Sequence, residues 1–143
     1  MSFLKKLFGK GDPAEGASPL VKDLIGDDMS ARQAALGRVL NMGNREALDA
    51  VEEAIRRLTG KKEIDFYRPG GMRMGSPQDA YNQVVELARK GKMGDDPAHV
   101  QSLIPGVAFM NQQLMQELGR IDKKALTLYQ LLGVQMQLKM KVG

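Results

Sequence analysis

Three consecutive segments in the first half of the chain repeat apolar side chains at the spacing of amphipathic helices. Each segment follows a residue whose side chain can accept a backbone N–H bond at a helix start, namely Ser18, Asp28 and Asn44. Gly43 and Gly60 come directly after the second and third segments, where glycine commonly ends a helix. The pattern predicts three short helices joined by turns so tight that consecutive helices lie antiparallel.

Two more helices are expected in the middle of the chain. Ser76-Pro77 provides the cap and the N-terminal proline of a helix that ends near Gly91. Asp95-Asp96-Pro97 begins a shorter helix, which Pro105-Gly106 is expected to stop. These elements complete a helical body that spans residues 18–106.

From Val107 onward the apolar positions keep a period of about 3.6 residues without losing phase. We predict one long helix over residues 107–141, bent at Gly119. The alternative is a pair of helices that separate at Gly119-Arg120, with Asp122 as the cap of the second. The apolar stripe is a candidate surface for self-association or for a partner protein. The residues assigned to this role are Leu114, Leu118, Ile121, Leu128, Leu132 and Met136.

Uncharged glutamines and flexible methionines flank this stripe. Such side chains make an adaptable contact surface, because amides cost less to desolvate than charges and thioethers adjust their shape. The alternative is that the long helix is the central helix of its own bundle, and the two roles are compatible. The flanking residues are Gln112, Gln113, Gln116, Gln130, Gln135, Gln137, Met115 and Met140.

Composition favours an all-α fold. The 143 residues are 43% apolar and 27% charged, which suits one globular domain, and aromatic residues make up only 5% with no Trp. The absence of Cys excludes disulfides, thiolate chemistry and sulfur-ligated metal sites. We expect a small helical bundle with a long C-terminal helix. Its regions are an amphipathic peptide (1–10), a linker (11–17), the helical body (18–106) and the C-terminal helix (107–143).

Residues 26–58 resemble one HEAT-type helical repeat unit. The resemblance rests on the acidic turn Gly26-Asp27-Asp28, the following Arg32, the Ala/Leu-rich helix, the Gly43-Asn44 turn and the second apolar helix from Ala47. In that family such units stack into solenoids that bind other proteins. The resemblance therefore implies a HEAT-like helix pair and a role in protein binding.

The first ten residues form a short amphipathic segment. Its apolar side chains fall on one side and its lysines on the other, and it is far too short to span a bilayer. We predict that it docks on an anionic membrane surface or in the groove of a partner protein; the alternative is that it covers the protein's own core. The residues assigned to docking are Phe3, Leu4, Lys5, Lys6, Leu7 and Phe8.

Positive charge is concentrated at the two ends of the chain. The net charge is +4, yet residues 1–10 carry three lysines and residues 123–143 carry four, with no acid in either segment. A mildly acidic body with basic ends indicates anionic partners that are reached through the termini.

The segment between the third and fourth expected helices is irregular. Four basic residues lie close to Phe66 and Tyr67, an arrangement that suits single-stranded nucleic acid or another anionic ligand. The alternative is an ordered loop whose aromatic side chains pack on the core. The basic residues of this candidate patch are Lys61, Lys62, Arg68 and Arg73.

The sequence offers little for catalysis. His99 is the only histidine, and its pairing with Asp95 has the spacing of a surface helix contact. We expect no catalytic residues, no cofactor and no metal site. The leading interpretation is a non-enzymatic adaptor or assembly subunit, cytoplasmic and recruited to the inner membrane face by its N-terminal segment. The alternative function is nucleic-acid binding by a basic helical protein.

Overall fold

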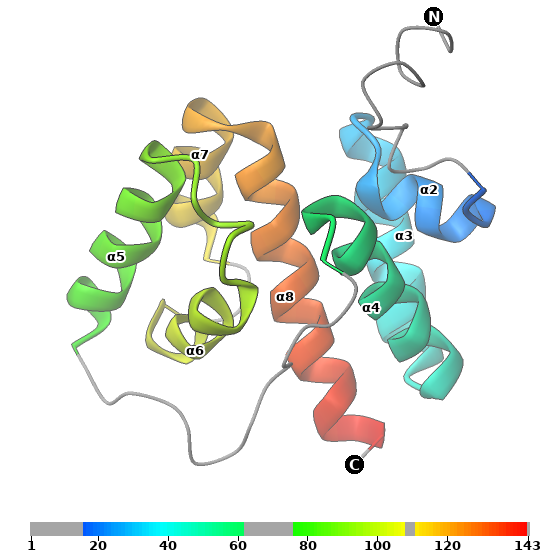
Figure 1. The fold of residues 1–143 in the computed structure, drawn as a ribbon. Coiled ribbons are helices and arrows are strands. Elements are labelled where there is room, and N and C mark those ends of the chain that lie inside the picture. Colours follow the sequence, from blue (N-terminus) through cyan, green and yellow to red (C-terminus); the bar gives the residue numbers. More distant parts are fainter. Residues whose placement is uncertain (1–15, 62–75, 108–110, 143) are drawn as a thin grey trace, which may run out of the picture.

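The structure is a computed structural model that describes residues 16–61, 76–107 and 111–142. These ranges contain seven α-helices and no strand, which confirms the expected all-α fold (Figure 1). The helices are α2 (Pro19–Ile25), α3 (Met29–Met42), α4 (Arg45–Thr59), α5 (Pro77–Arg89), α6 (Pro97–Val107), α7 (Gln112–Ile121) and α8 (Lys123–Val142).

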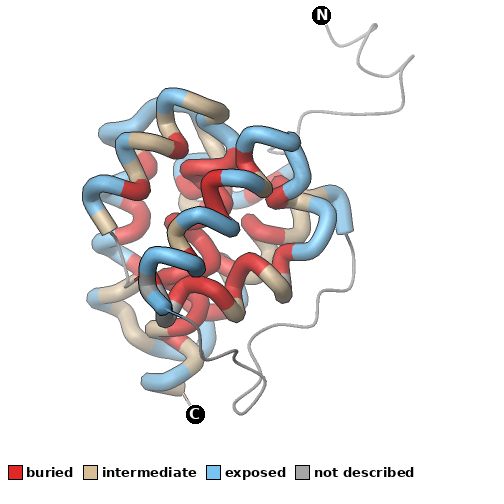
Figure 2. Tube along the Cα trace, turned by 90° about the vertical axis from the view of Figure 1, so that its left-hand side faces the viewer, coloured by how far each residue is buried: buried red, intermediate tan, exposed pale blue. Residues whose placement is uncertain are grey.

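Helix α8 is the central element of the bundle. It runs between α2, α3 and α4 on one side and α5, α6 and α7 on the other, and the two groups meet mainly through it (Figure 1). Every residue from Ala125 to Met136 is buried, so α8 is covered around its whole circumference along this stretch. Figure 2 shows the buried positions in the interior and the exposed ones on the outer turns. A helix buried on all sides has to be the core of its bundle.

The caps predicted for the first three helices are present. The side chains of Ser18, Asp28 and Asn44 accept backbone N–H bonds from the residues three positions later, at 3.3, 3.2 and 2.9 Å. Gly43 and Gly60 end α3 and α4 with φ of 53° and 74°, a left-handed conformation that glycine adopts without strain. Local side-chain chemistry therefore sets these boundaries.

The prediction of one continuous helix over 107–141 is wrong. Helix α7 ends at Ile121, Asp122 is extended with φ of −164° and ψ of 116°, and α8 begins at Lys123. The Asp122 carboxylate accepts the Lys124 backbone N–H at 3.0 Å, as the two-helix alternative proposed, although the break lies beyond Gly119-Arg120. An interruption of one residue hardly shifts the apolar phase, which is why the periodicity did not reveal it.

The end of α6 also differs from the prediction. The helix continues through Pro105-Gly106 to Val107 instead of stopping at the proline. Proline removes one N–H donor but has a φ compatible with a helix, so a final turn can still form over it.

In the described part of the chain, no helix is both long enough and apolar enough to cross a bilayer.

Candidate functional site

The stripe predicted for self-association lies largely inside the protein. Leu114, Leu118, Leu128 and Leu132 are at most 1% exposed, and Met136 is 9% exposed. Ile121 is partly buried against the same core. Their association role stays a prediction, but a partner could reach the four leucines only if α7 or α8 separated from the bundle.

Two glutamines expected beside that stripe are buried in α8 and bind the helices around it. Gln130 accepts a hydrogen bond at 2.9 Å from Nε of Arg32 in α3 and donates one at 3.5 Å to the sulfur of Met115 in α7. Arg32 also donates from Nη1 to the Gly26 carbonyl at 2.8 Å, near the C-terminal end of α2. Burial lowers the pKa of Arg32, and the negative charge of Asp27 opposes that shift. Gln130 thus connects both helix groups across the core.

Gln135 makes a second connection of the same kind. It donates a hydrogen bond to a carboxylate oxygen of Glu52 in α4 at 2.9 Å and accepts one from the Gln101 side chain in α6. The Gln101 Oε1 atom is buried and has no hydrogen-bond partner in the described structure. Both hydrogen-bond networks lie inside the bundle, where they fix the orientation of α8. A partner would therefore have to bind on the outer surfaces of the helices.

The outer faces of the neighbouring helices α3 and α4 differ in chemistry. The outer face of α4 is charged along its length, with i,i+4 pairs Arg45–Asp49 at 3.5 Å and Arg57–Glu53 at 2.8 Å. The outer face of α3 is small and uncharged apart from Arg38 at its edge. Its exposed residues are Ser30, Gln33, Ala34, Gly37 and Asn41, with Met29, which is 48% exposed, at its start.

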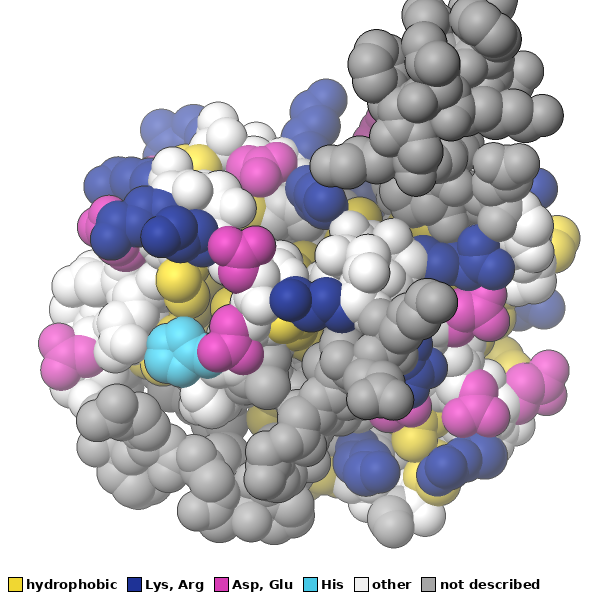
Figure 3. All heavy atoms as spheres, viewed as in Figure 1, with side chains coloured by type: hydrophobic (Ala, Val, Ile, Leu, Met, Phe, Trp, Pro, Cys, Tyr) yellow, Lys and Arg dark blue, Asp and Glu magenta, His cyan; other side chains and the backbone are white. Residues whose placement is uncertain are grey.

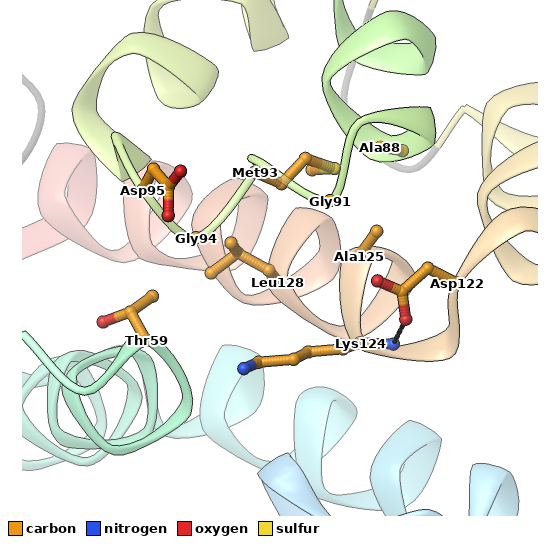
Figure 4. A pocket seen from close by; sticks show the side chains of 10 residues that line it. All are labelled: Thr59, Ala88, Gly91, Met93, Gly94, Asp95, Asp122, Lys124, Ala125 and Leu128. Atoms are coloured by element: carbon orange, nitrogen blue, oxygen red, sulfur yellow. Dashed lines mark hydrogen bonds between the residues drawn. The ribbon is translucent and has the colours of Figure 1, made fainter.

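A small pocket at one end of the bundle is lined by one lysine, two aspartates and otherwise mostly small or apolar residues. The pocket has a volume of about 120 Å³ and lies where the end of α4, the α5–α6 loop and the start of α8 meet. Figure 4 shows Lys124 extending along it toward α4, while Asp95 and Asp122 lie on other parts of its wall. Figure 3 shows several Lys and Arg side chains, with Asp and Glu side chains between them, over the upper left of the molecule, where α5 and α7 end. Drug-sized ligands occupy pockets of about 300–1,000 Å³, so this pocket is too small for them.

Several predicted docking residues lie outside the described structure. They are Phe3, Leu4, Lys5, Lys6, Leu7, Phe8, Lys62, Arg68 and Arg73. Lys61 is described and exposed just after α4, close in sequence to Thr59 of the pocket wall. The roles predicted for the N-terminal segment and for the basic loop remain predictions.

The described residues include one histidine, His99, and no cysteine. Among them no three His, Asp or Glu side chains are placed to hold a metal ion. Two backbone contacts are described for His99: its N–H donates to the Asp96 side chain at the start of α6, and its carbonyl accepts a hydrogen bond from the Ser102 hydroxyl. Comparisons of the chain with protein-family models, curated proteins and solved structures find no match.

Proposed function

We propose that this chain is a non-enzymatic protein-binding subunit that docks a partner helix on the outer face of α3. The observation that carries the proposal is the contrast between the two neighbouring helices: α4 presents paired charges to solvent, whereas the centre of the α3 face presents Ala34, Gly37 and uncharged polar side chains, with Arg38 only at its edge. Small side chains let a second helix approach closely, and an uncharged face is desolvated at little cost.

Other features support the same role. The caps at both ends of α3 and the buried contacts of Arg32 hold this helix firmly, so its outer face is presented on a rigid element. The resemblance of residues 26–58 to a HEAT-type unit points to protein binding as well. We further propose that the protein is cytoplasmic and that residues 1–10 bring it to the inner face of a membrane.

The test compares charge insertions on two helices. Ala34→Lys with Gly37→Lys places two charges on the α3 face, and Asn82→Lys with Gln83→Lys places the same charges on exposed positions of α5. Light scattering after size exclusion measures self-association, and crosslinking in the native cell extract detects other partners. The α3 variant should weaken association about tenfold or more, and the α5 variant should leave it intact.

Two results would overturn the proposal. A wild-type protein that stays monomeric and crosslinks to nothing has no docking surface. An α3 variant that associates as well as the wild type places the docking surface elsewhere.

A further inference from the structure

Four segments, of which the last two are adjacent in the sequence, bring positive charge to one end of the bundle. They are the end of α4, the end of α5 with the loop that follows, the end of α7 and the first turn of α8. We call this surface the basic end. Its residues are Lys61, Arg89, Lys90, Lys92, Arg120, Lys123 and Lys124.

Among the described residues, the lysines of the basic end form no ion pair. Glu117 binds Arg120 at 2.7 Å and lies 3.8 Å from Arg89, so one carboxylate is shared by the two arginines. In the described structure, Lys90, Lys92, Lys123 and Lys124 have no carboxylate within ion-pair distance. Their charge is therefore available to an outside partner.

Two of these lysines occupy positions that are unfavourable for the stability of α8. Lys123 and Lys124 form the start of this helix, and its first turn contains no acidic residue. The positive end of the helix dipole favours acids here and is repelled by lysines. The Asp122 carboxylate, which accepts the Lys124 backbone N–H at 3.0 Å, offsets part of this positive charge, so the two lysines are an unfavourable but partly compensated choice at this helix start.

We propose that the basic end lies against a membrane surface that carries anionic lipid headgroups. Each exposed lysine near such a surface contributes about 1 kcal/mol of attraction, so unpaired lysines gathered on one end are an effective electrostatic contact. This contact supplements the membrane recruitment proposed for residues 1–10, because a single short apolar segment binds a bilayer only marginally and stable anchoring takes a second signal.

The described residues of the basic end fit a membrane better than a nucleic acid. Single-stranded nucleic acid needs aromatic side chains for base stacking, and the described tyrosines are the buried Tyr129 and the partly buried Tyr81. The two arginines, which would best grip a phosphate, already share Glu117. The pocket is also too small to enclose a nucleotide.

The experiment measures sedimentation of the full chain with two kinds of vesicle, phosphatidylcholine alone and phosphatidylcholine mixed equally with phosphatidylglycerol. The test variant is Lys123→Glu with Lys124→Glu. The matched control is Lys22→Glu with Arg45→Glu, which makes the same change of net charge at exposed positions of α2 and α4. A chain that lacks residues 1–10 is measured alongside.

The wild type should bind the anionic vesicles and not the neutral ones. The test variant should bind them at least about 30-fold more weakly, since two lysine contacts are lost. Its Tm should rise by about 2–4 °C, because glutamate suits the start of α8. Loss of binding with a gain in stability cannot come from misfolding. The control should stay within about threefold of the wild type, since exposed charges distant from the membrane are screened.

Several outcomes would overturn the proposal. One is equal binding of the test variant and the wild type, and another is equal binding to neutral and anionic vesicles. A third is a wild type that prefers a single-stranded oligonucleotide to the anionic vesicles and loses that preference in the test variant. If deletion of residues 1–10 abolishes vesicle binding while the test variant binds normally, the membrane role proposed for residues 1–10 is supported and the one proposed for the basic end is wrong. The second variant Lys90→Ser with Lys92→Ser, in the α5–α6 loop, should weaken binding without touching α8.

Discussion

The two groups of helices hold α8 by different chemistry. On the side of α2, α3 and α4, the partners of its buried glutamines are charged: Arg32 binds Gln130 and Glu52 binds Gln135. On the side of α5, α6 and α7, the partners are the sulfur of Met115 and the amide of Gln101. Hydrogen bonds to charged groups are about twice as strong as those between neutral groups. A buried charge without a hydrogen-bond partner also lowers the stability of the fold more than a buried amide without one.

This difference indicates which side of the bundle separates first. Helix α4 also makes the most extensive packing contact with α8. We therefore expect α8 to remain attached to α2, α3 and α4 when the protein opens locally, with α5, α6 and α7 exchanging their amide protons sooner.

The largest effect on stability is expected where α8 meets α2, α3 and α4, since the partners of its glutamines there are charged. Gln130→Leu removes the acceptor of Arg32 Nε and leaves a buried guanidinium without that hydrogen bond. The free energy of unfolding should fall by about 2–3 kcal/mol, measured by urea denaturation. The double variant Arg32→Met with Gln130→Leu should recover part of the loss, because the buried charge is then absent.

A matched substitution on the other side sharpens the comparison. Gln101→Leu removes the partner of Gln135 Oε1 but also removes the buried Gln101 Oε1 that has no partner. The two changes have opposite effects on stability, so the free energy of unfolding should fall by less than about 1 kcal/mol. Equal losses in Gln130→Leu and Gln101→Leu would contradict the asymmetry.

Sequence patterns predicted the two sides of the molecule unequally. On the first side, the caps Ser18, Asp28 and Asn44 act within three residues of themselves, so the sequence contains all the information for their helices. The sequence favoured one continuous helix over a break at Asp122, because a single extended residue keeps the apolar positions on both sides of it in phase.

The buried glutamines and the basic end were not predicted for a different reason. Gln130 and Gln135 look like surface residues until Arg32 and Glu52, from about a hundred residues earlier in the chain, meet them in the core. The lysines at 90–92 and 123–124 are separate short runs that only the packing of α5, α7 and α8 brings to one end. Periodicity and capping are local signals, so they carry no information about such distant pairs.

An effect smaller than that of Gln130→Leu is expected at a hydrogen bond that α8 makes through the phenol of Tyr129. The hydroxyl of Tyr129 accepts the Asn111 backbone N–H at 2.9 Å, at the start of α7. Tyr129→Phe leaves that N–H without this acceptor, so the free energy of unfolding should fall by about 1–2 kcal/mol at neutral pH. Urea denaturation measures this loss of stability. The control is Tyr81→Phe, at a partly buried position of α5, for which we expect no change in the free energy of unfolding.

The same tyrosine predicts a pH dependence. Burial raises the pKa of Tyr129, and the hydrogen bond from Asn111 only partly opposes this shift. The folded protein therefore keeps the phenol proton at a pH where the unfolded chain, with a pKa of about 10, has lost it. The stability from this group is complete below about pH 10 and is lost as the pH rises through the folded pKa. Wild-type stability should fall more steeply than that of Tyr129→Phe above about pH 10, and parallel curves would contradict the assignment.

The smallest effect compares helical glycines from the two sides. A Cβ at Gly37 in α3 would meet nothing within 4 Å, whereas a Cβ at Gly119 in α7 would lie 3.4 Å from Leu126 Cδ2. Gly37→Ala should stabilise the protein by about 0.5–1 kcal/mol, because alanine loses less backbone entropy in a helix. Gly119→Ala should gain less, since Leu126 at the start of α8 has to accommodate the methyl group. Thermal denaturation measures the change of stability in each variant. A larger gain at Gly119 than at Gly37 would contradict the prediction and would mean that the contact between α7 and α8 has room for the added methyl group.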